Sequence, residues 1–168
     1  MTHHETAQHI TIHTDGSCSP NPGPGGYAAV LRRMDGKTQL KRKIIKGFEP
    51  RETTSVRMEM IAVLKALEFL KPAEPQPIHI YSDNDLVANG ITRWLQDWIG
   101  RGWRTAQGKP VQNVDLWQAI VAATKGKRIT WNWVKSHAGD PMNEQADRIA
   151  RRQMEIARDE VGTLLFAT

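Results

Sequence analysis

The chain has 168 residues, and its 23 Lys and Arg exceed its 18 Asp and Glu, giving a net charge of +5 with neutral histidines. A length of ~100–200 residues is typical of one domain, so we expect a single domain over residues 1–168, with a core at about 9–158 and frayed ends. Cys18 is the single cysteine of the sequence, which excludes an intrachain disulfide and a cysteine-rich zinc site.

Hydropathy and charge limit the location and the partners. The first residues carry no apolar run, and the most hydrophobic window, Ile61–Leu70, is interrupted by Lys65, so we expect neither a signal peptide nor a membrane span. Together with the lone cysteine, this favours a reducing, cytoplasmic setting. The excess of cations suggests a polyanionic partner, but charge alone is equally compatible with a basic domain that binds none.

The N-terminal part of the chain is predicted to form antiparallel strands. Three β-like segments occur there: His9–Thr14, Gly26–Met34 and Lys37–Ile45. The first segment stops at Asp15 and is followed by a loop rich in Pro and Gly. The pair Asp35-Gly36 between the other two is typical of a hairpin turn, so we expect those strands to be antiparallel.

A helix is predicted next. The segment Glu52–Ser55 offers capping side chains and Pro72 cannot continue a helix, so we place this helix from the cap to about Lys71. Apolar residues recur within it at helical spacing and form the expected buried face: Met60, Val63, Leu64, Leu67 and Leu70.

The second half of the chain alternates strands and helices. In chain order we expect a strand, a helix, a Trp-rich arm, a helix, a strand and a helix: Ile78–Ser82, about Asp83–Gly90, Ile91–Gly108, Val114–Ala123, Arg128–Val134 and about Asn143–Glu160. Helices between the later strands imply parallel crossovers. The predicted fold class is therefore α/β, with one mixed five-stranded sheet (three antiparallel strands, then parallel ones) and helices on both faces.

Two of the expected strands finish on an aspartate. Because side chains alternate along a strand, Asp15 shares a face with His13, and Asp83 shares a face with Tyr81. If these strands are neighbours, their backbones lie ~5 Å apart and both carboxylates meet at one end of the sheet. Two ionised carboxylates at that distance repel each other. A bound divalent cation removes the conflict, and oxygen ligands suit Mg²⁺ or Mn²⁺.

Two further acids, Glu59 and Asp147, can join this pair. Glu59 lies near the start of its helix, where it can face the sheet end, and Asp147 lies on the small-residue face of the last helix. Each acid also has an ordinary interpretation: Asp15 as a turn residue before Gly16, Asp83 as a helix cap, the other two as helix-surface charges. For any single acid the ordinary interpretation is the more frequent one, and the matched strand endings change this only modestly.

Longer motifs narrow the choice. Five of them occur in order between about Ile10 and Arg152: TDGSCSPNPGPGGYAAVL, RMEMIAVLKALE, YSDNDLVANGITRWLQDW, RGWRTAQGKPVQNVDLW and WNWVKSHAGDPMNEQADRIA. The chain thereby resembles bacterial ribonuclease H of type 1. The resemblance implies a ribonuclease H-like fold and an endonuclease that uses Mg²⁺ to cut the RNA strand of RNA–DNA hybrids, leaving 5′-phosphate and 3′-hydroxyl ends. The implied partner is the hybrid duplex, and we expect a monomer.

The resemblance also assigns roles by motif position. It implies two Mg²⁺ ions per site, with Mn²⁺ as a possible substitute, held by four acids: Asp15, Glu59, Asp83 and Asp147. His137 matches a loop histidine with an auxiliary role in proton transfer or product release, and Glu144 matches an acid that assists nearby. Asp15 would then end its strand to hold metal, and the Pro- and Gly-rich loop would let backbone lie against a nucleic-acid groove.

Substrate contacts follow from the same resemblance. Asn21 matches a residue that touches the groove of the hybrid, Asn113 matches another in the arm region, and Thr54 matches one near a phosphate of the DNA strand. Aromatic and basic side chains of the arm could grip that strand: Arg93, Trp94, Trp98, Arg101, Trp103, Arg104 and Lys109. The tryptophans could equally pack the arm onto the body. We expect Trp94 to contact substrate and the others to lie mostly in the core: Trp98, Trp103, Trp117, Trp131 and Trp133.

The sequence departs from the family pattern at three places. Ser55-Val56 stands where relatives often carry an Asn pair, Asp85 where they often carry Gln, and Ile99-Gly100 where they often carry lysines. Val56 cannot form a side-chain hydrogen bond, and ionised Asp85 can only accept one. We therefore expect weaker groove contacts, and a higher KM, than in typical relatives.

Two other functions remain open at this point. A related nuclease or transposase-like enzyme could use the same sheet, although the SHAG motif and the arm argue against it. A hybrid-binding module with an inactive site is the non-enzymatic alternative, and the presence of all four acids argues against that.

Overall fold

The protein is described by a computed structural model that covers residues 7–135 and 139–166. Within these residues a five-stranded sheet has the order β3-β2-β1-β4-β5. Its strands are β1 (Gln8–Cys18), β2 (Gly23–Asp35), β3 (Thr38–Thr53), β4 (Ile78–Ser82) and β5 (Ile129–Trp133). The β1–β2 and β2–β3 pairs are antiparallel, while β1–β4 and β4–β5 are parallel. The predicted mixed sheet is confirmed.

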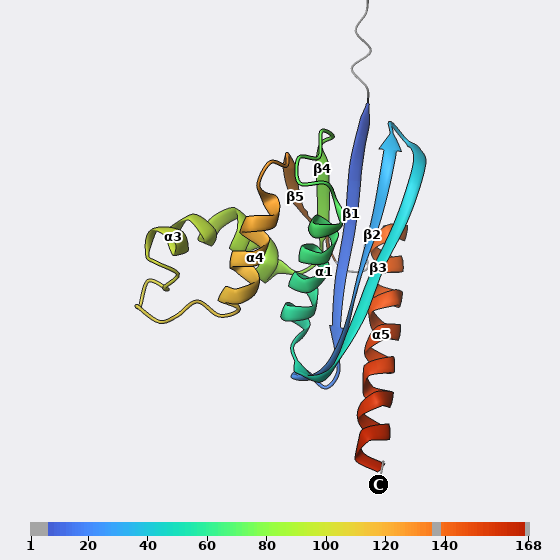
Figure 1. The fold of residues 1–168 in the computed structure, drawn as a ribbon, viewed down its shortest axis with the longest axis vertical. Coiled ribbons are helices and arrows are strands. Elements are labelled where there is room, and N and C mark those ends of the chain that lie inside the picture. Colours follow the sequence, from blue (N-terminus) through green and yellow to red (C-terminus); the bar gives the residue numbers. More distant parts are fainter. Residues whose placement is uncertain (1–6, 136–138, 167–168) are drawn as a thin grey trace, which may run out of the picture.

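Helices cover both faces of this sheet (Figure 1). They are α1 (Ser55–Phe69), α2 (Asp85–Asn89), the π-helical turn η1 (Gly90–Trp94), α3 (Leu95–Gly100), α4 (Val114–Thr124) and α5 (Pro141–Phe166). Helix α1 packs on β1 and β2 and also contacts α4, whereas α5 packs on β1, β2 and β3. None of the described helices is long and apolar enough to span a membrane.

Two adjacent glycines of β2 show how closely the layers approach. A Cβ on Gly25 would lie 2.7 Å from Met58 of α1, and a Cβ on Gly26 would lie 2.3 Å from the backbone nitrogen of Met154 in α5. Because neighbouring side chains in a strand point to opposite faces, α1 and α5 lie on opposite sides of β2. The Gly-rich start of β2 is therefore a packing requirement of both helices.

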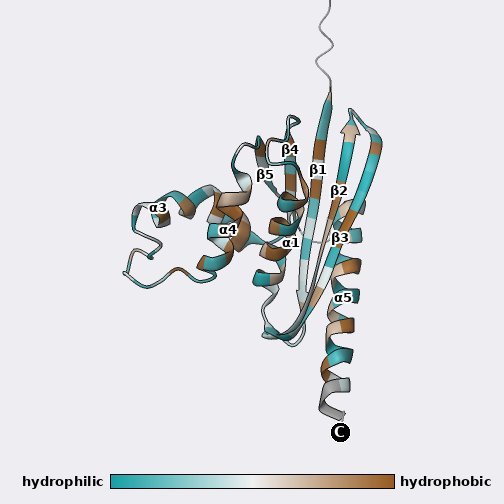
Figure 2. Cartoon of the chain, viewed as in Figure 1, coloured by the Kyte–Doolittle hydropathy of each residue, from teal (hydrophilic) through white to brown (hydrophobic). Residues whose placement is uncertain are grey.

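The main core lies between the sheet and the α1–α4 layer. Met60, Val63 and Leu67 of α1 are buried against Ile12 and Ile80, as the helical spacing predicts. Hydrophobic residues concentrate on the central strands and on the inner sides of α1 and α4, whereas much of β3 is hydrophilic (Figure 2). Leu64 and Leu70 are only partly buried but still pack against this core.

Several element boundaries differ from the sequence prediction. Strand β1 does not stop at Asp15 but continues to Cys18, because the residues after Asp15 pair with Gly25–Tyr27 of β2. Strand β3 likewise extends to Thr53 along β2. Helix α5 runs to Phe166, so residues 161–166 are helical where the sequence predicts a frayed end.

The arm is joined to the body by contacts between tilted indole rings. Its helical part consists of η1 and α3, and the ring of Trp98 lies 5.9 Å from that of Trp94 and 5.4 Å from that of buried Trp117. Trp98, Trp103 and Trp131 are partly buried against the core. The prediction that these tryptophans are mostly core is confirmed for them and for Trp117. It is wrong for Trp133, which is 54% exposed at the end of edge strand β5.

Candidate metal centre and nucleic-acid interface

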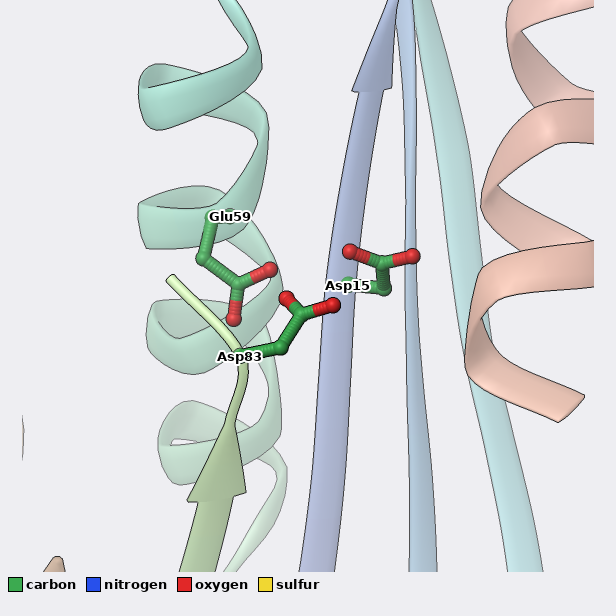
Figure 3. Close-up of side chains that lie close together, drawn as sticks. All are labelled: Asp15, Glu59 and Asp83. Atoms are coloured by element: carbon green, nitrogen blue, oxygen red, sulfur yellow. The ribbon is translucent and has the colours of Figure 1, made fainter. Parts of the chain in front are cut away.

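Three carboxylates from three elements converge at one end of the sheet. Strands β1 and β4 run parallel with Thr14 opposite Ser82, so the next residues, Asp15 and Asp83, lie side by side. Glu59 reaches them from α1, and the three carboxylates point toward one another (Figure 3). One ligand atom from each lies within 4.8 Å of the other two. The predicted convergence of Asp15, Asp83 and Glu59 is present.

Glu59 is held in place by hydroxyl groups of the two strands. It is 1% exposed, and its Oε1 accepts hydrogen bonds from Thr14 Oγ1 at 2.5 Å and from Ser82 Oγ at 2.8 Å. Its Oε2 is buried and has no hydrogen-bond partner among the described residues. A buried carboxylate oxygen without a donor is costly, and coordination of a cation would satisfy it.

Gly16 explains why a glycine follows Asp15. A Cβ at this position would lie 2.3 Å from the backbone nitrogen of Glu59, so only glycine lets α1 approach β1 this closely. Gly16 is part of β1 and pairs with Tyr27, which makes the turn interpretation of the Asp15-Gly16 pair wrong. The glycine places the Glu59 carboxylate beside that of Asp15.

Burial and mutual repulsion disfavour ionisation of these carboxyl groups. Burial, followed by the nearby charges of Glu59 and Asp83, raises the pKa of Asp15 to about 9. Burial also raises the pKa of Glu59 to about 7, against the opposing effect of the hydrogen bonds from Thr14 and Ser82. A divalent cation would reverse both shifts by stabilising the ionised forms. The donor set, oxygen atoms only, fits Mg²⁺ or Mn²⁺.

Asp147 lines the same depression as Asp15 and Asp83, but its carboxylate forms an ion pair with an arginine. It comes from α5, and its Oδ1 lies 3.2 Å from Nε of Arg151, one helical turn away. We call the depression the acidic cavity; it is lined by Asp15, Gly16, Ser17, Cys18, Asn21, Ser55, Asp83, Asn143, Glu144, Asp147 and Arg151. Among the described residues, the tight group of three carboxylates does not include Asp147. Its neighbours Ala146 and Ala150 are fully buried, as its small-residue face predicts.

His137 lies outside the described residues. Glu144, by contrast, lines the acidic cavity together with Asp147, where the resemblance places it.

A second depression adjoins the acidic cavity and contains most of the expected substrate contacts. We call it the arm groove; it is lined by Asn21, Thr54, Val56, Leu86, Trp94, Trp98, Thr105, Lys109, Pro110, Val111, Gln112, Asn113 and Trp117. Asn21 lines both depressions, and its side chain is fixed by Ser55, which receives a hydrogen bond on Oγ at 2.9 Å and donates its backbone N–H at 3.3 Å. One ligand could therefore extend from the acidic cavity into the arm groove past Asn21.

The arm arginines do not join this groove in the described part of the chain. Arg104 donates to the Gly108 carbonyl oxygen at 3.0 Å, and Arg101 is exposed beyond α3. The cation of the arm that lines the groove is Lys109.

Val56 and Asp85, the two residues near the acids that depart from the family pattern, lie in different depressions. Val56 lines the arm groove, whereas Asp85 lines another cavity beside α2 and β5, where its Oδ1 accepts a hydrogen bond from Asn89 at 2.9 Å. Asp85 lies in the first turn of α2, a favourable position for a negative charge. Val56 and Asp85 therefore line different depressions of the protein, and their contacts with substrate stay a prediction.

Sequence reasoning missed two arginines near the site. Arg151 follows Asp147 at the i,i+4 spacing of helical ion pairs, which was a readable signal. Arg57 contacts Asn113 and Asp115, more than fifty residues away in the chain, and no local pattern predicts such a contact.

Known proteins similar to this chain agree with this geometry. The family model for RNase H matches residues 7–155. A ribonuclease H of Ruegeria sp. (strain TM1040) is 51% identical over 145 residues, which cover 86% of this chain and 90% of the relative. A ribonuclease H of Maricaulis maris (strain MCS10) is 51% identical over 149 residues, covering 89% and 95%.

Solved structures show the same fold. LC9-RNase H1, a type 1 RNase H with the type 2 active-site motif, superposes with a TM-score of 0.77 at 28% identity, covering 90% of this chain and 74% of the other. LC11-RNase H1, solved in complex with an RNA/DNA hybrid, superposes with a TM-score of 0.65 at 19% identity, covering 88% and 98%. The match to the family model and the half-identical relatives establish that the chain belongs to the RNase H family.

Proposed function

We propose that this protein hydrolyses the RNA strand of RNA–DNA hybrids with two divalent cations, Mg²⁺ or in its place Mn²⁺, and leaves 5′-phosphate and 3′-hydroxyl ends. As a member of its family it is an endoribonuclease, and the two-ion mechanism and the product ends are the proposed part. The observation that carries them is the group of Asp15, Glu59 and Asp83, with ligand atoms within 4.8 Å of one another. Such a group is destabilising without a cation, because burial and repulsion oppose its ionisation.

Asp15, Glu59, Asp83 and Asp147 are the proposed metal ligands. Bound divalent cations would supply Lewis-acid stabilisation of charge at the scissile phosphate and a water molecule of lowered pKa. The protein's part is to hold the carboxylates in place: Thr14 and Ser82 orient Glu59, and the β1–β4 pairing sets Asp15 beside Asp83. The ion pair with Arg151 limits the rotation of Asp147.

His137 and Glu144 have proposed auxiliary roles. A histidine near a metal centre can transfer protons near neutral pH, which suits protonation of the leaving oxygen or release of product. Glu144 lines the acidic cavity one turn before Asp147 and would support the same steps.

The proposed substrate contacts follow the two adjoining depressions. A hybrid duplex has a wide minor groove lined on one strand by 2′-hydroxyl groups. We propose that Asn21 reads this groove between the acidic cavity and the arm groove, and that Thr54, Asn113 and Trp94 contact the DNA strand. Trp94 is 38% exposed, so its ring can stack or pack against the sugar-phosphate chain. Arg101 and Arg104 are proposed to reach phosphates beyond the groove.

The decisive experiment compares substrates and metal conditions. We expect cleavage of a labelled RNA–DNA hybrid in Mg²⁺, no cleavage in EDTA, and little or none of double-stranded RNA or DNA. A transposase-like nuclease would cut DNA instead, and an inactive binding module would retain the hybrid without cutting it. Either result would contradict the proposal. Monomeric state and cytoplasmic location stay predictions, which light scattering and cell fractionation can test.

A further inference from the structure

Arg57 connects the two sides of the arm groove. Its backbone N–H donates to Thr54 Oγ1 at 3.1 Å, and its Nη1 donates to Asn113 Oδ1 at 3.1 Å. Thr54 comes from the start of α1 and Asn113 from the start of α4, and both line the groove. The backbone N–H of Arg57 thus binds the side chain of Thr54, which the resemblance places near a phosphate of the DNA strand, and its guanidinium binds the side chain of Asn113, which the resemblance assigns to the groove of the hybrid.

The contact with Arg57 sets which end of the Asn113 amide faces the groove. A guanidinium group only donates hydrogen bonds, so the atom that meets it must be the amide oxygen. The amide nitrogen is then the end that a groove ligand would meet. Asn113 has a left-handed backbone with a φ of 57° and makes no side-chain capping bond to the described residues of α4. Its side chain is therefore oriented by Arg57 and not by the helix that it begins.

The Thr54 hydroxyl is likewise left free to donate a hydrogen bond. Because its Oγ1 accepts the N–H of Arg57, its hydroxyl hydrogen points to another partner. Thr54 and Asn113 consequently both offer donors, an arrangement that suits a group with only acceptors. Phosphate oxygens are such acceptors, and Lys109, which lines the same groove, adds positive charge.

Asp115 keeps Arg57 in this role. Its two carboxylate oxygens accept from Nη1 at 3.1 Å and Nη2 at 2.9 Å, a bidentate pair that fixes the plane of the guanidinium. The hydrogen bond with Arg57 holds the pKa of Asp115 below its usual value, so the pair stays ionised at neutral pH. The charge of Arg57 is already matched by Asp115, so orientation rather than direct phosphate binding is the function that remains for it.

We propose that Arg57 is a positioning residue whose guanidinium presents the Asn113 amide, beside the Thr54 hydroxyl, as a donor to a phosphate of the DNA strand. The role rests on the proposed function, because the DNA strand is that of the hybrid. The Arg57 side chain acts through Asn113 and makes no contact with substrate itself. Loss of the guanidinium contacts with Asn113 and Asp115 therefore weakens substrate binding and leaves the chemical step unchanged.

A double-mutant cycle tests this role. Arg57→Lys keeps the charge and the backbone N–H but loses the two-pronged contact with Asn113 and Asp115. We expect Arg57→Lys and Asn113→Ala each to raise KM about threefold to tenfold, as for one lost hydrogen bond, with kcat unchanged. The double variant should have the KM of Asn113→Ala alone. Additive effects, or a fall in kcat in place of the rise in KM, would overturn the proposal.

Two further variants keep the test independent of folding defects. Asp115→Asn weakens the bidentate contact that holds the Arg57 guanidinium in place. It should also raise KM, but by a smaller factor. Asn113→Asp still accepts from Arg57 but presents a carboxylate in place of a donor, so KM should rise more than for Asn113→Ala. A KM equal to that of the wild type for Asn113→Asp would exclude phosphate at this position.

The matched control is Arg152→Lys. Arg152 forms an exposed pair with Glu155 at 3.1 Å on α5, away from both depressions, and its change should leave KM unaltered. The failure of the proposed function would look different from the failure of this inference. A wild-type protein that cleaves no hybrid in Mg²⁺ refutes the function, whereas active wild type with an additive cycle refutes only the role of Arg57.

Discussion

At the scale of single residues, the four acids and His137 should differ sharply in what their loss costs. Asp15→Asn or Asp83→Asn removes a charge from a proposed metal ligand, so we expect hydrolysis to fall by orders of magnitude. His137→Ala should leave a measurable remnant, because general acid–base assistance is typically worth ~10²–10⁴-fold. Single-turnover cleavage of a labelled hybrid measures both, and a His137→Ala variant as inactive as Asp15→Asn would contradict the auxiliary role.

Val56 and Asp85 should also behave differently, because they face different cavities. Val56→Asn adds a donor and an acceptor to the arm groove, so we expect KM to fall by about threefold to tenfold for one new hydrogen bond. Asp85→Gln should leave KM within about twofold, the effect of a charge removed from the start of a helix being small. Steady-state kinetics on hybrid decide this, and a fall in KM for Asp85→Gln alone would place that residue at the substrate.

At the scale of elements, the docking of α5 on β2 depends on the absence of a side chain at Gly26. A Cβ there would lie 2.3 Å from Met154 N and 2.5 Å from Ala150 O, both backbone atoms that cannot rotate away. We expect Gly26→Ala to lower the free energy of unfolding by about 1–3 kcal/mol or more.

Gly162→Ala in α5 is the control for this change, since a Cβ at Gly162 meets no described atom within 4 Å. It should raise stability by about 0.5–1 kcal/mol, the usual gain from replacing a helical glycine. Urea unfolding followed by circular dichroism gives both values. Equal stability of Gly26→Ala and wild type would mean that α5 does not pack on β2 as described.

The arm should contribute to binding through salt-dependent interactions with phosphates. If Arg101 and Arg104 bind phosphates as proposed, their joint replacement by Ala should flatten the dependence of log Kd on log salt, by about 1 for each phosphate that is no longer bound. Cleavage at saturating substrate should be spared, because neither side chain lines the acidic cavity. Titration of a labelled hybrid at several salt concentrations in EDTA measures the slope, and an unchanged slope would assign the arm a packing role only.

At the scale of the whole molecule, the acidic cluster should make stability depend on pH and on metal. The pKa of Asp15 is raised from 3.8 to about 9 and that of Glu59 from 4.5 to about 7, so without metal the folded state binds more protons than the unfolded state. The stability that these two carboxyl groups contribute should therefore be fully present below pH 3.8 and be lost as pH rises through both folded pKa values, toward about 9.

Mg²⁺ should oppose this loss, because it binds the ionised carboxylates of the folded state. Differential scanning calorimetry in EDTA and in Mg²⁺ between pH 5 and 9 measures the effect, and the difference in Tm should widen with pH. Asp15→Asn is the control: in EDTA its Tm should fall less steeply as pH rises. A Tm that is independent of pH in EDTA for the wild-type protein would contradict the raised pKa values.

The sequence by itself determined the mixed five-stranded sheet and which strand faces carry the acids. Side-chain alternation is a local property of a strand, so the shared faces of His13 with Asp15 and of Tyr81 with Asp83 could be read without coordinates, whereas the parallel pairing of β1 with β4 was only assumed until the structure showed it. Helix positions added Glu59 and Asp147 as candidates, and the resemblance added their metal-binding role and the groove residues. Whether the proposed residues act as metal ligands and substrate contacts stays a prediction.

Only the tertiary structure decided where strands end and what each polar side chain faces. Strand β1 passes beyond Asp15 because β2 continues to pair with it, and Gly16 is required by the backbone of α1 rather than by a turn. The separation of Val56 from Asp85, the exposure of Trp133 and the contact of Arg57 with Asn113 could not be read from the chain. Each depends on packing between segments far apart in sequence, which local spacing and propensity do not encode.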